Sequence, residues 1–344
     1  MKLRELSSHL GLSPTTVSRA LAGYPEVSAK TRARVVEAAA QHGYQPNQRA
    51  KALATGRSFY IGHIVSSHDT EEMVNPIAGD FIGGLTERCA DFGYSLSMRL
   101  AKPDQEAMTF RKLRSEGAVD GVVLQLPREN DSRIALMHEI GMPFVMHGRA
   151  RGITAPYSWL DVNNTRAFHR ATRFLMDLGH RSIGLINGNE TVDYAVRRRA
   201  GYVAALTEAG IKADPALMTN GPMTEDKGHG AMREMLGRPV PPSAVVVSSI
   251  TQAIGVRRAI QEAGLTMGQD VSVIAHDDDL SYLSNRQTVP VFTAVRSSVR
   301  EAGQRLAEML IRQIEQPAQS VQEQLLEAEL VVGTSTGAAP KVSA

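Results

Sequence analysis

From residue 59 onward, short β-branched and apolar runs alternate with longer segments of helical periodicity. The runs that predict strands are Tyr60–Val65, Tyr94–Arg99, Gly121–Gln125, Pro143–His147, Ser182–Asn187, Ala244–Ser248 and Val271–His276. Helices are predicted between them, among them Asp80–Phe92, Arg166–Leu178, Ala195–Ala209, Thr251–Ala263 and Arg300–Gln316. Strands that are joined through a helix pair in parallel and are covered by helices. The pattern predicts an α/β fold of parallel sheets flanked by helices.

The length of the chain indicates more than one compact unit. At 344 residues and 37.3 kDa, the chain exceeds a typical domain. A weak internal similarity, Ile61-Gly62-His63-Ile64 against Ile183-Gly184-Leu185-Ile186, suggests two similar halves. Ligands of parallel α/β sheets bind beside the carboxyl ends of the strands, so we expect a binding site there.

Composition excludes several classes of protein. Apolar residues make up 42% and charged residues 22% of the chain, as in a globular protein. No segment reaches the ~18 consecutive apolar residues of a membrane span, and the charges at Lys2, Arg4 and Glu5 are unlike a signal peptide. The single cysteine, Cys89, allows no internal disulfide and no zinc site with several thiolates. We expect a cytoplasmic protein with no membrane partner.

The sequence also lacks the common motifs of catalysis and cofactor binding. It contains no HExxH pair, no GxSxG elbow and no GxxxxGK[ST] loop. Asp277, Asp278 and Asp279 follow a predicted strand, where acidic side chains can bind magnesium, but no phosphate-binding glycine loop accompanies them. We therefore predict no enzyme, no cofactor and no metal site.

Charge is distributed unevenly along the chain. Residues 1–57 contain nine basic and three acidic side chains, a net charge of +6, whereas the remainder contains 29 basic and 33 acidic side chains, a net charge of −4. A small basic head on a mildly acidic body favours a polyanionic partner for the head alone. A solvated basic surface with no partner is the alternative.

The basic head has the pattern of three short helices. Leu3–Leu10 carries apolar residues at helical spacing, and a second helix over residues 14–21 follows the cap Ser13. Ser28 caps a third helix that runs to Gly43. We expect the second helix to bury Val17, Ala20 and Leu21, and the third to bury Val35, Val36 and Ala39.

Two short helices joined by a tight glycine turn, followed by a supporting helix, form the helix-turn-helix arrangement, whose second helix enters the major groove of DNA. Arg19 has the reach to bind a guanine edge, and Thr15 can contact a base or a thymine methyl group. Short hydroxyl side chains near helix N-termini suit phosphate oxygens, although they also cap helices. The predicted DNA-binding set in this head is Ser13, Pro14, Thr15, Thr16, Ser18, Arg19, Ser28 and Thr31.

Three motifs follow one another along the head: Leu12-Ser13-Pro14-Thr15-Thr16-Val17-Ser18-Arg19-Ala20-Leu21-Ala22-Gly23, Val27-Ser28-Ala29-Lys30-Thr31-Arg32 and Gly43-Tyr44-Gln45-Pro46-Asn47. Together they resemble the LacI/GalR family of bacterial transcription regulators. The match continues over nearly the whole chain. Ala22 departs from it, because the family usually has asparagine there.

The resemblance implies that residues 48–56 form a hinge helix. In this family two hinge helices pair in the dimer and wedge a leucine into the minor groove; here that residue would be Leu53, with Asn47 and Ala50 beside it. An apolar wedge unstacks a base step and kinks the duplex. Eight residues form no stable helix alone, so the segment should order only on DNA beside its dimer mate.

The resemblance also implies a core of two periplasmic-binding-protein-like lobes, with a ligand cleft between them and chain crossings near residues 161, 291 and 324. Arg198 and Asp277 match the family's ligand-binding arginine and aspartate, a pair suited to adjacent hydroxyl groups. His147 and Arg149 replace the usual Asp-Arg pair. Tyr194 and Trp159 are the candidate aromatic platforms for a sugar ring, with packing in the fold as the alternative for each. The predicted effector-binding set is Ser66, Asn75, His147, Arg149, Tyr194, Arg198, Ser249, Asp277 and Arg296.

The sequence thus predicts an α/β protein with an all-α helix-turn-helix head over residues 1–46, a hinge over 47–58 and a two-lobed core over 59–340. Lobe one is expected over about 59–160 and 293–323, and lobe two over about 162–290 and 325–337. The expected function is that of a homodimeric repressor that binds double-stranded operator DNA and is released by a mono- or disaccharide, as in α-glucoside regulators. A purine or a protein co-repressor is the alternative within the family, and a sugar-binding transport protein is the alternative outside it.

Overall fold

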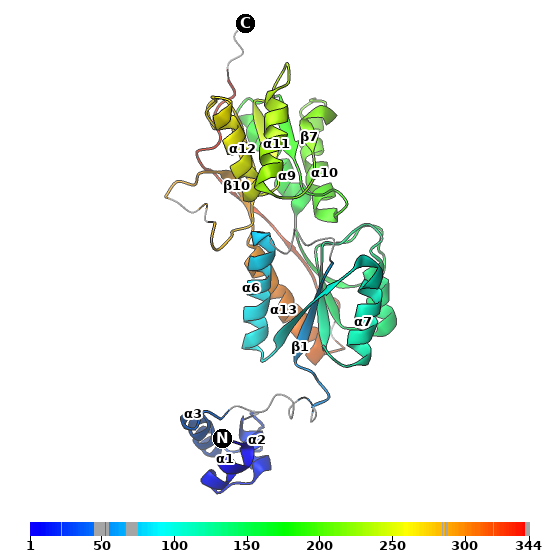
Figure 1. The fold of residues 1–344 in the computed structure, drawn as a ribbon, viewed down its shortest axis with the longest axis vertical. Helices are drawn as coiled ribbons and strands as arrows, with labels where there is room; N and C mark the ends of the chain where they lie inside the picture. Colours follow the sequence, from blue (N-terminus) through cyan, green and yellow to red (C-terminus); the bar gives the residue numbers. More distant parts are fainter. Residues whose placement is uncertain are drawn as a thin grey trace. The chain divides into compact units, whose positions relative to one another are not determined.

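The computed structural model describes residues 1–21, 23–44, 52, 55–66, 75–283, 285, 288–318 and 320–340. It divides into two compact units, Met1–Phe59 and Tyr60–Ala344 (Figure 1). Within the described residues, no helix has both the length and the apolar character that a membrane crossing requires.

The first unit is a helical head. Its helices are α1 (Leu3–Leu10), α2 (Pro14–Leu21) and α3 (Ala29–Gln41), which confirms the predicted elements. Leu6, Val17 and Val35 are fully buried and form the centre of a small apolar core. Val36 is 51% exposed, so its predicted burial was wrong: the buried face of α3 continues through Ala38 and Ala39, three and four residues after Val35.

The second unit contains two six-stranded sheets, each covered by helices on both faces. The first sheet has the order β11-β5-β4-β3-β1-β2 and the second has the order β12-β10-β9-β8-β6-β7. The strands are β1 (Tyr60–Ser66), β2 (Ser95–Ala101), β3 (Gly121–Gln125), β4 (Phe144–His147), β5 (Ser158–Val162), β6 (Ile183–Ile186), β7 (Met218–Thr219), β8 (Ala244–Val247), β9 (Ser272–Asp277), β10 (Thr293–Arg296), β11 (Glu323–Leu326) and β12 (Glu329–Val331).

Each sheet is sandwiched between two groups of helices. In lobe one, α7 (Glu106–Ser115) and α8 (Ser132–Ile140) pack on one face, while α6 (Pro76–Asp91) and α13 (Val299–Glu315) lie side by side (Figure 1). In lobe two, α9 (Asn164–Asp177) and α10 (Asp193–Glu208) cover one face, and α11 (Glu225–Leu236) and α12 (Ile250–Glu262) cover the other. Short 3-10 turns occur at Pro103–Gln105 and Pro215–Leu217.

All paired neighbours in the two sheets run parallel except β10 and β12. This confirms the predicted parallel α/β class. It also places the carboxyl ends of the parallel strands of each sheet along one edge, where α/β proteins bind ligands.

Two of the predicted lobe boundaries need correction. β10 pairs with β9 in the second sheet, and only the following helix α13 packs on lobe one, so the second crossing lies at residues 297–298 and not near 291. β11 pairs with β5 and β12 pairs with β10, so the third crossing lies at residues 327–328 and not near 324. The second crossing lies later than predicted because Ala294 and Val295 are fully buried in the second lobe, so the chain leaves that lobe only after them.

Candidate functional site

The exposed face of α2 carries the side chains predicted to contact DNA. Thr15, Ser18 and Arg19 are exposed, as is Pro14 at the start of the helix, while Val17 and Ala20 face the core. A helix with a packed inner face and a polar outer face can be presented to a groove without loss of its core.

The serine residues ahead of α2 and α3 are helix caps. Ser13 Oγ accepts a hydrogen bond from Thr16 N at 3.0 Å, and Ser28 Oγ accepts one from Thr31 N at 3.2 Å. Both serines are exposed and both threonines partly so, which leaves the hydroxyl groups at helix N-termini where phosphates bind. The other predicted DNA contacts, Asn47, Ala50 and Leu53, lie outside the described residues, as does Ala22.

Two arginines of the head have structural partners inside the head. Arg32 Nη2 donates to the carbonyl oxygens of Gly23 and Tyr24, at 3.1 and 2.8 Å, and thus fastens the turn between α2 and α3. Arg34 Nη2 donates to the carbonyl oxygen of Leu10. Part of the basic charge that the sequence shows therefore stabilises the head itself.

A cleft between the two lobes opens at the carboxyl ends of both sheets. Its walls include Gln125 at the end of β3, His147 at the end of β4, Asp161 in β5, Asp278 after β9 and Ser297 after β10. Four of the predicted effector-binding residues line it: Asn75, His147, Tyr194 and Arg198.

Arg198 is the most tightly held cation of the cleft. Its side chain is only 6% exposed, and it donates from Nε to Asn164 Oδ1 at 2.8 Å and from Nη1 to the Ser248 carbonyl at 2.7 Å. Its guanidinium carbon lies 4.9 Å from the centre of the Tyr194 ring. Burial lowers the pKa of Arg198, so a further acceptor supplied by a ligand would stabilise its charge.

A chain of hydrogen bonds connects Arg198 to lobe one. Asn164 Nδ2 donates to Asp161 Oδ1 at 3.3 Å, and Arg149 Nε donates to Asp161 Oδ2 at 2.9 Å. Burial raises the pKa of Asp161, and the Arg149 guanidinium opposes this rise. Arg149 itself does not line the cleft, but it positions the Asp161 carboxylate, which does. The Arg149 guanidinium carbon lies over the Trp159 ring, 5.0 Å from the ring centroid.

Among Asp277, Asp278 and Asp279, it is Asp278 that lines the cleft, not the predicted Asp277. Asp277 is the last residue of β9, is 3% exposed, and accepts a hydrogen bond from Asp279 N at 2.9 Å, so it shapes the turn. Because successive residues of a strand face opposite sides, a shift of one position decides which carboxylate reaches the cleft. Beside it, His276 Nε2 lies 3.3 Å from Ser297 Oγ.

His147 contributes a neutral imidazole to the part of the cleft wall that lobe one forms. Its ring stacks on Phe81 with centroids 4.9 Å apart and planes 14° apart. Burial lowers the pKa of His147 to about 4, so the ring is uncharged near neutral pH. Asn75 caps α6 by accepting from Ile77 N at 3.1 Å.

The remaining predicted effector contacts are not part of the described cleft wall. Ser66, at the end of β1, lines a neighbouring cavity in lobe one. Ser249 is 1% exposed and caps α12 by accepting from Gln252 N at 3.1 Å. Arg296 Nη2 pairs with Glu329 across β10 and β12 at 2.9 Å, because both side chains project from paired strand positions.

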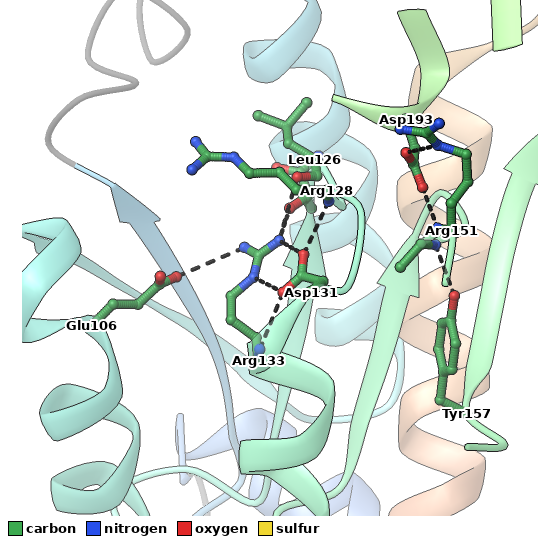
Figure 2. Close-up of polar contacts among 10 residues, drawn as sticks. Glu106, Leu126, Arg128, Asp131, Arg133, Arg151, Tyr157 and Asp193 are labelled. Carbon is green, nitrogen blue, oxygen red and sulfur yellow. Dashed lines mark hydrogen bonds and ion pairs between the residues drawn. The ribbon is translucent and has the colours of Figure 1, made fainter. Parts of the chain in front are cut away.

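Two buried carboxylates link the lobes beside the cleft. Asp193, at the start of α10, accepts from Arg151 Nε at 2.6 Å (Figure 2). Its backbone N–H donates to the Pro127 carbonyl at 2.9 Å. Asp80 in α6 accepts from both the backbone N–H and the hydroxyl of Ser281, each at 2.7 Å. These contacts depend on the relative position of the lobes and would break on a large interlobe rotation.

Comparisons with known proteins match this architecture from end to end. Residues 2–47 match the family described as bacterial regulatory proteins, lacI family, and residues 172–336 match a periplasmic binding protein-like domain. The chain is 44% identical to the HTH-type transcriptional regulator AglR of Rhizobium meliloti (strain 1021), over 99% of this chain and 95% of AglR. The chain belongs to the LacI family.

Solved structures of LacI-family proteins have the same fold. The transcriptional regulator CelR–cellobiose complex has a TM-score of 0.72 at 27% identity, covering 97% of this chain and 99% of CelR. The lac repressor dimer bound to operator and the anti-inducer ONPF has a TM-score of 0.77 at 25% identity, covering 98% and 99%. The protein is therefore a DNA-binding transcription regulator with an effector-binding core, and its family is non-enzymatic.

Sequence reasoning missed Asp161, Asn164, Asp278 and Ser297 in the LacI-family cleft. Asp161 lies in β5, whose sequence Ser-Trp-Leu-Asp-Val is not the continuous apolar run that indicates a buried strand. A carboxylate and an amide that flank a domain crossing were an available signal. Ser297 was missed because the crossing was predicted too early.

Proposed function

We propose that this LacI-family regulator represses sugar-utilisation genes as a homodimer, and that a small carbohydrate in the interlobe cleft releases it from its operator. The observation that carries the proposal is the set of Arg198, Asp161 and Asp278 around one cleft. A guanidinium donates in a fork and carboxylates accept from O–H groups, which together suit adjacent hydroxyls.

An α-glucoside is the effector class that we infer. Support comes from the resemblance of the sequence to α-glucoside regulators, to which the 44% identity to AglR adds. The cellobiose complex of CelR, which has the same two-lobed fold, supports a glucose disaccharide of either linkage. Tyr194 adds apolar ring surface to the polar wall, a combination that suits the polar edge and apolar face of a sugar ring.

For the DNA-binding part, we infer domains at residues 1–46, a hinge at 47–58 and an effector core at 59–340. In a two-fold dimer, two heads read a pseudo-palindrome, and Leu53 of each hinge wedges into the minor groove. Effector binding shifts the equilibrium between two relative arrangements of the lobes, and this changes the geometry of the hinge. Such a shift requires that the effector bind the two arrangements with different affinities. The regulator acts in the cytoplasm, where its operator lies.

The test measures sugar binding and operator release on the same protein. A thermal-shift screen against mono- and disaccharides, purines and sugar phosphates identifies the effector class, because a ligand that binds the folded state raises the melting temperature. Fluorescence anisotropy on an operator selected from random duplexes then measures release. We expect Arg198→Ala to keep operator affinity and lose release.

A response to purines alone would replace the carbohydrate with another effector class. Release that persists in Arg198→Ala would move the binding site away from this cleft. The DNA-binding role is tested separately, by operator binding without any ligand.

A further inference from the structure

Two histidine side chains of the helical head meet at its surface. His9 lies in the last turn of α1, and His42 is the C-cap residue of α3. Their Nε2 atoms are 3.3 Å apart, and their ring centroids are 4.6 Å apart with an angle of 77° between the planes. Both residues are exposed, so they do not belong to the apolar core that holds the head together. Neither is among the residues predicted to contact DNA.

The distance between the two nitrogens is that of a metal chelate. Zinc binds imidazole nitrogens at roughly 2.0–2.1 Å, in a tetrahedral arrangement. Two nitrogens that share such an ion are therefore about 3.3–3.4 Å apart, which is the separation of the Nε2 atoms of His9 and His42. Because both rings are at the surface, small side-chain rotations can direct the two lone pairs to one ion.

A hydrogen bond between the two rings is the alternative use of this contact. It needs a proton on one Nε2 and a lone pair on the other, whereas a metal ion needs a lone pair on both. At 3.3 Å the contact is longer than the roughly 2.7–3.2 Å of most N–H···O bonds. An ion that displaces this proton therefore replaces only a weak bond between exposed side chains.

The ends of two helices favour a cation at this position. The C-terminal end of a helix carries a partial negative charge, which stabilises cations near its last turn. His9 and His42 are at the C-terminal ends of α1 and α3, so an ion between them lies near two such ends. The Arg34 guanidinium already uses the end of α1, because it donates to the carbonyl oxygen of Leu10.

The ligands and the charge of the head select the class of ion. The head has a net charge of +6, and within the described residues no third histidine, cysteine or carboxylate completes a metal-binding group with the pair. Magnesium and calcium prefer oxygen ligands and are not suited to two imidazoles on a basic surface. Imidazole suits zinc, copper and nickel. Water would fill the other positions, so binding should be weaker than at a structural zinc site with four protein ligands.

We propose that His9 and His42 form a two-ligand site for a divalent transition-metal ion of the zinc class, and that this ion bridges α1 and α3. The two residues are 33 positions apart in the chain, so the bridge closes a long loop. The unfolded chain does not hold the two imidazoles together, so the ion binds the folded head more tightly and stabilises it. The sequence-based prediction of no metal site rested on the single cysteine and the acidic run, and only the fold brings these histidines together.

Isothermal titration of the full-length protein with zinc chloride measures the site. We expect the wild type to bind zinc, and His9→Ala and His42→Ala each to weaken this binding by roughly tenfold or more, because each variant keeps a single imidazole. His138→Ala is the matched control: His138 is an exposed histidine in the last turn of α8 and contacts the edge of Phe144. Its removal should leave the zinc affinity unchanged, as should an excess of magnesium chloride.

Hydrogen exchange then tests whether the ion bridges the two helices. Zinc should slow amide exchange in α1 and α3 of the wild type, should not do so in His9→Ala or His42→Ala, and should leave exchange in α6 and α13 of the core unchanged. Circular dichroism of each variant checks that the head keeps its helices.

The two measurements decide the proposal together. Equal zinc affinities of the wild type and both single variants would show that zinc binds elsewhere. A loss of affinity in only one variant would show that the other histidine is not a ligand. Unchanged exchange in α1 and α3 of the wild type would show that no ion bridges them. Each of these results would overturn the site.

Discussion

The helical head and the two-lobed core solve the same packing problem in different ways. The head buries a few aliphatic side chains around Leu6, Val17 and Val35 and relies on serine caps at its helix ends. The core buries whole strands and brings helices so close that only glycine fits between them. Substitutions in the core should therefore act on the fold and on ligand binding, and substitutions on the head's surface should act on DNA binding.

The largest expected effect comes from a glycine in the core. A Cβ built on Gly84 of α6 lies 2.0 Å from the Arg300 carbonyl oxygen, because α6 and α13 cross in close contact there. Gly84→Ala should lower the free energy of unfolding by about 3 kcal/mol, since a backbone atom must move. Gly79, on the same helix, has nothing within 4 Å of its Cβ position.

Gly79→Ala is the matched control and should stabilise the core by about 0.5–1 kcal/mol, because alanine favours a helix. Urea unfolding followed by circular dichroism measures both variants. Equal stabilities of the two would contradict the close crossing of α6 and α13.

The next largest effect belongs to the head's outer face. Arg19→Ala should weaken binding to the selected operator about ten- to a hundredfold, as loss of one bidentate guanine contact does. Thermal stability and the melting shift produced by the effector should be unchanged. Arg258→Ala is the matched control. It removes one positive charge from α12, a helix of the core unit and not of the head, and should leave operator affinity unchanged. Anisotropy titrations at one fixed salt concentration decide between them.

The core should also lose stability in mild acid. Burial lowers the pKa of His147 to about 4 and also lowers the pKa values of His63, His180 and His276. Between pH 6.5 and 4 the unfolded chain therefore binds more protons than the folded one, and stability falls as pH falls. Burial raises the pKa values of Asp161 and Asp277, which opposes the loss at the acid end of this window.

His147 alone accounts for about 2 kcal/mol of this loss between pH 7 and pH 5. His147→Gln should accordingly make the unfolding free energy less dependent on pH over that interval. Denaturant titrations at pH 7 and pH 5 provide the measurement, and an unaltered slope in the variant would show that the imidazole is not buried in its neutral form.

The head could be predicted from sequence more completely than the core. Its caps, turns and apolar spacing are local signals, so the three helix bounds followed from residues that are near each other. Two side chains were misplaced: Val36 is exposed and Leu21 is only partly buried. In the core, β5, β7, β10, β11 and β12 are short or polar, and their strand character depends on partners far away in sequence. The cleft was predicted in outline through Arg198. Asp161 could have been found from its place at a domain crossing, but Asp278 required the register of β9, which no local pattern gives.

The smallest expected effect is that of a substitution in the head. Ser28→Ala removes the hydroxyl that accepts from Thr31 N, so one N–H at the start of α3 loses its side-chain partner. We expect a loss of about 1 kcal/mol in the stability of the head and none in the core. Ser28→Asp retains a capping acceptor and should restore stability, yet its negative charge would repel a phosphate and weaken operator binding. This pair of variants separates the two roles of one side chain. If the aspartate variant binds the operator as tightly as the wild type, Ser28 is a cap alone, and the DNA-binding surface of α3 begins elsewhere.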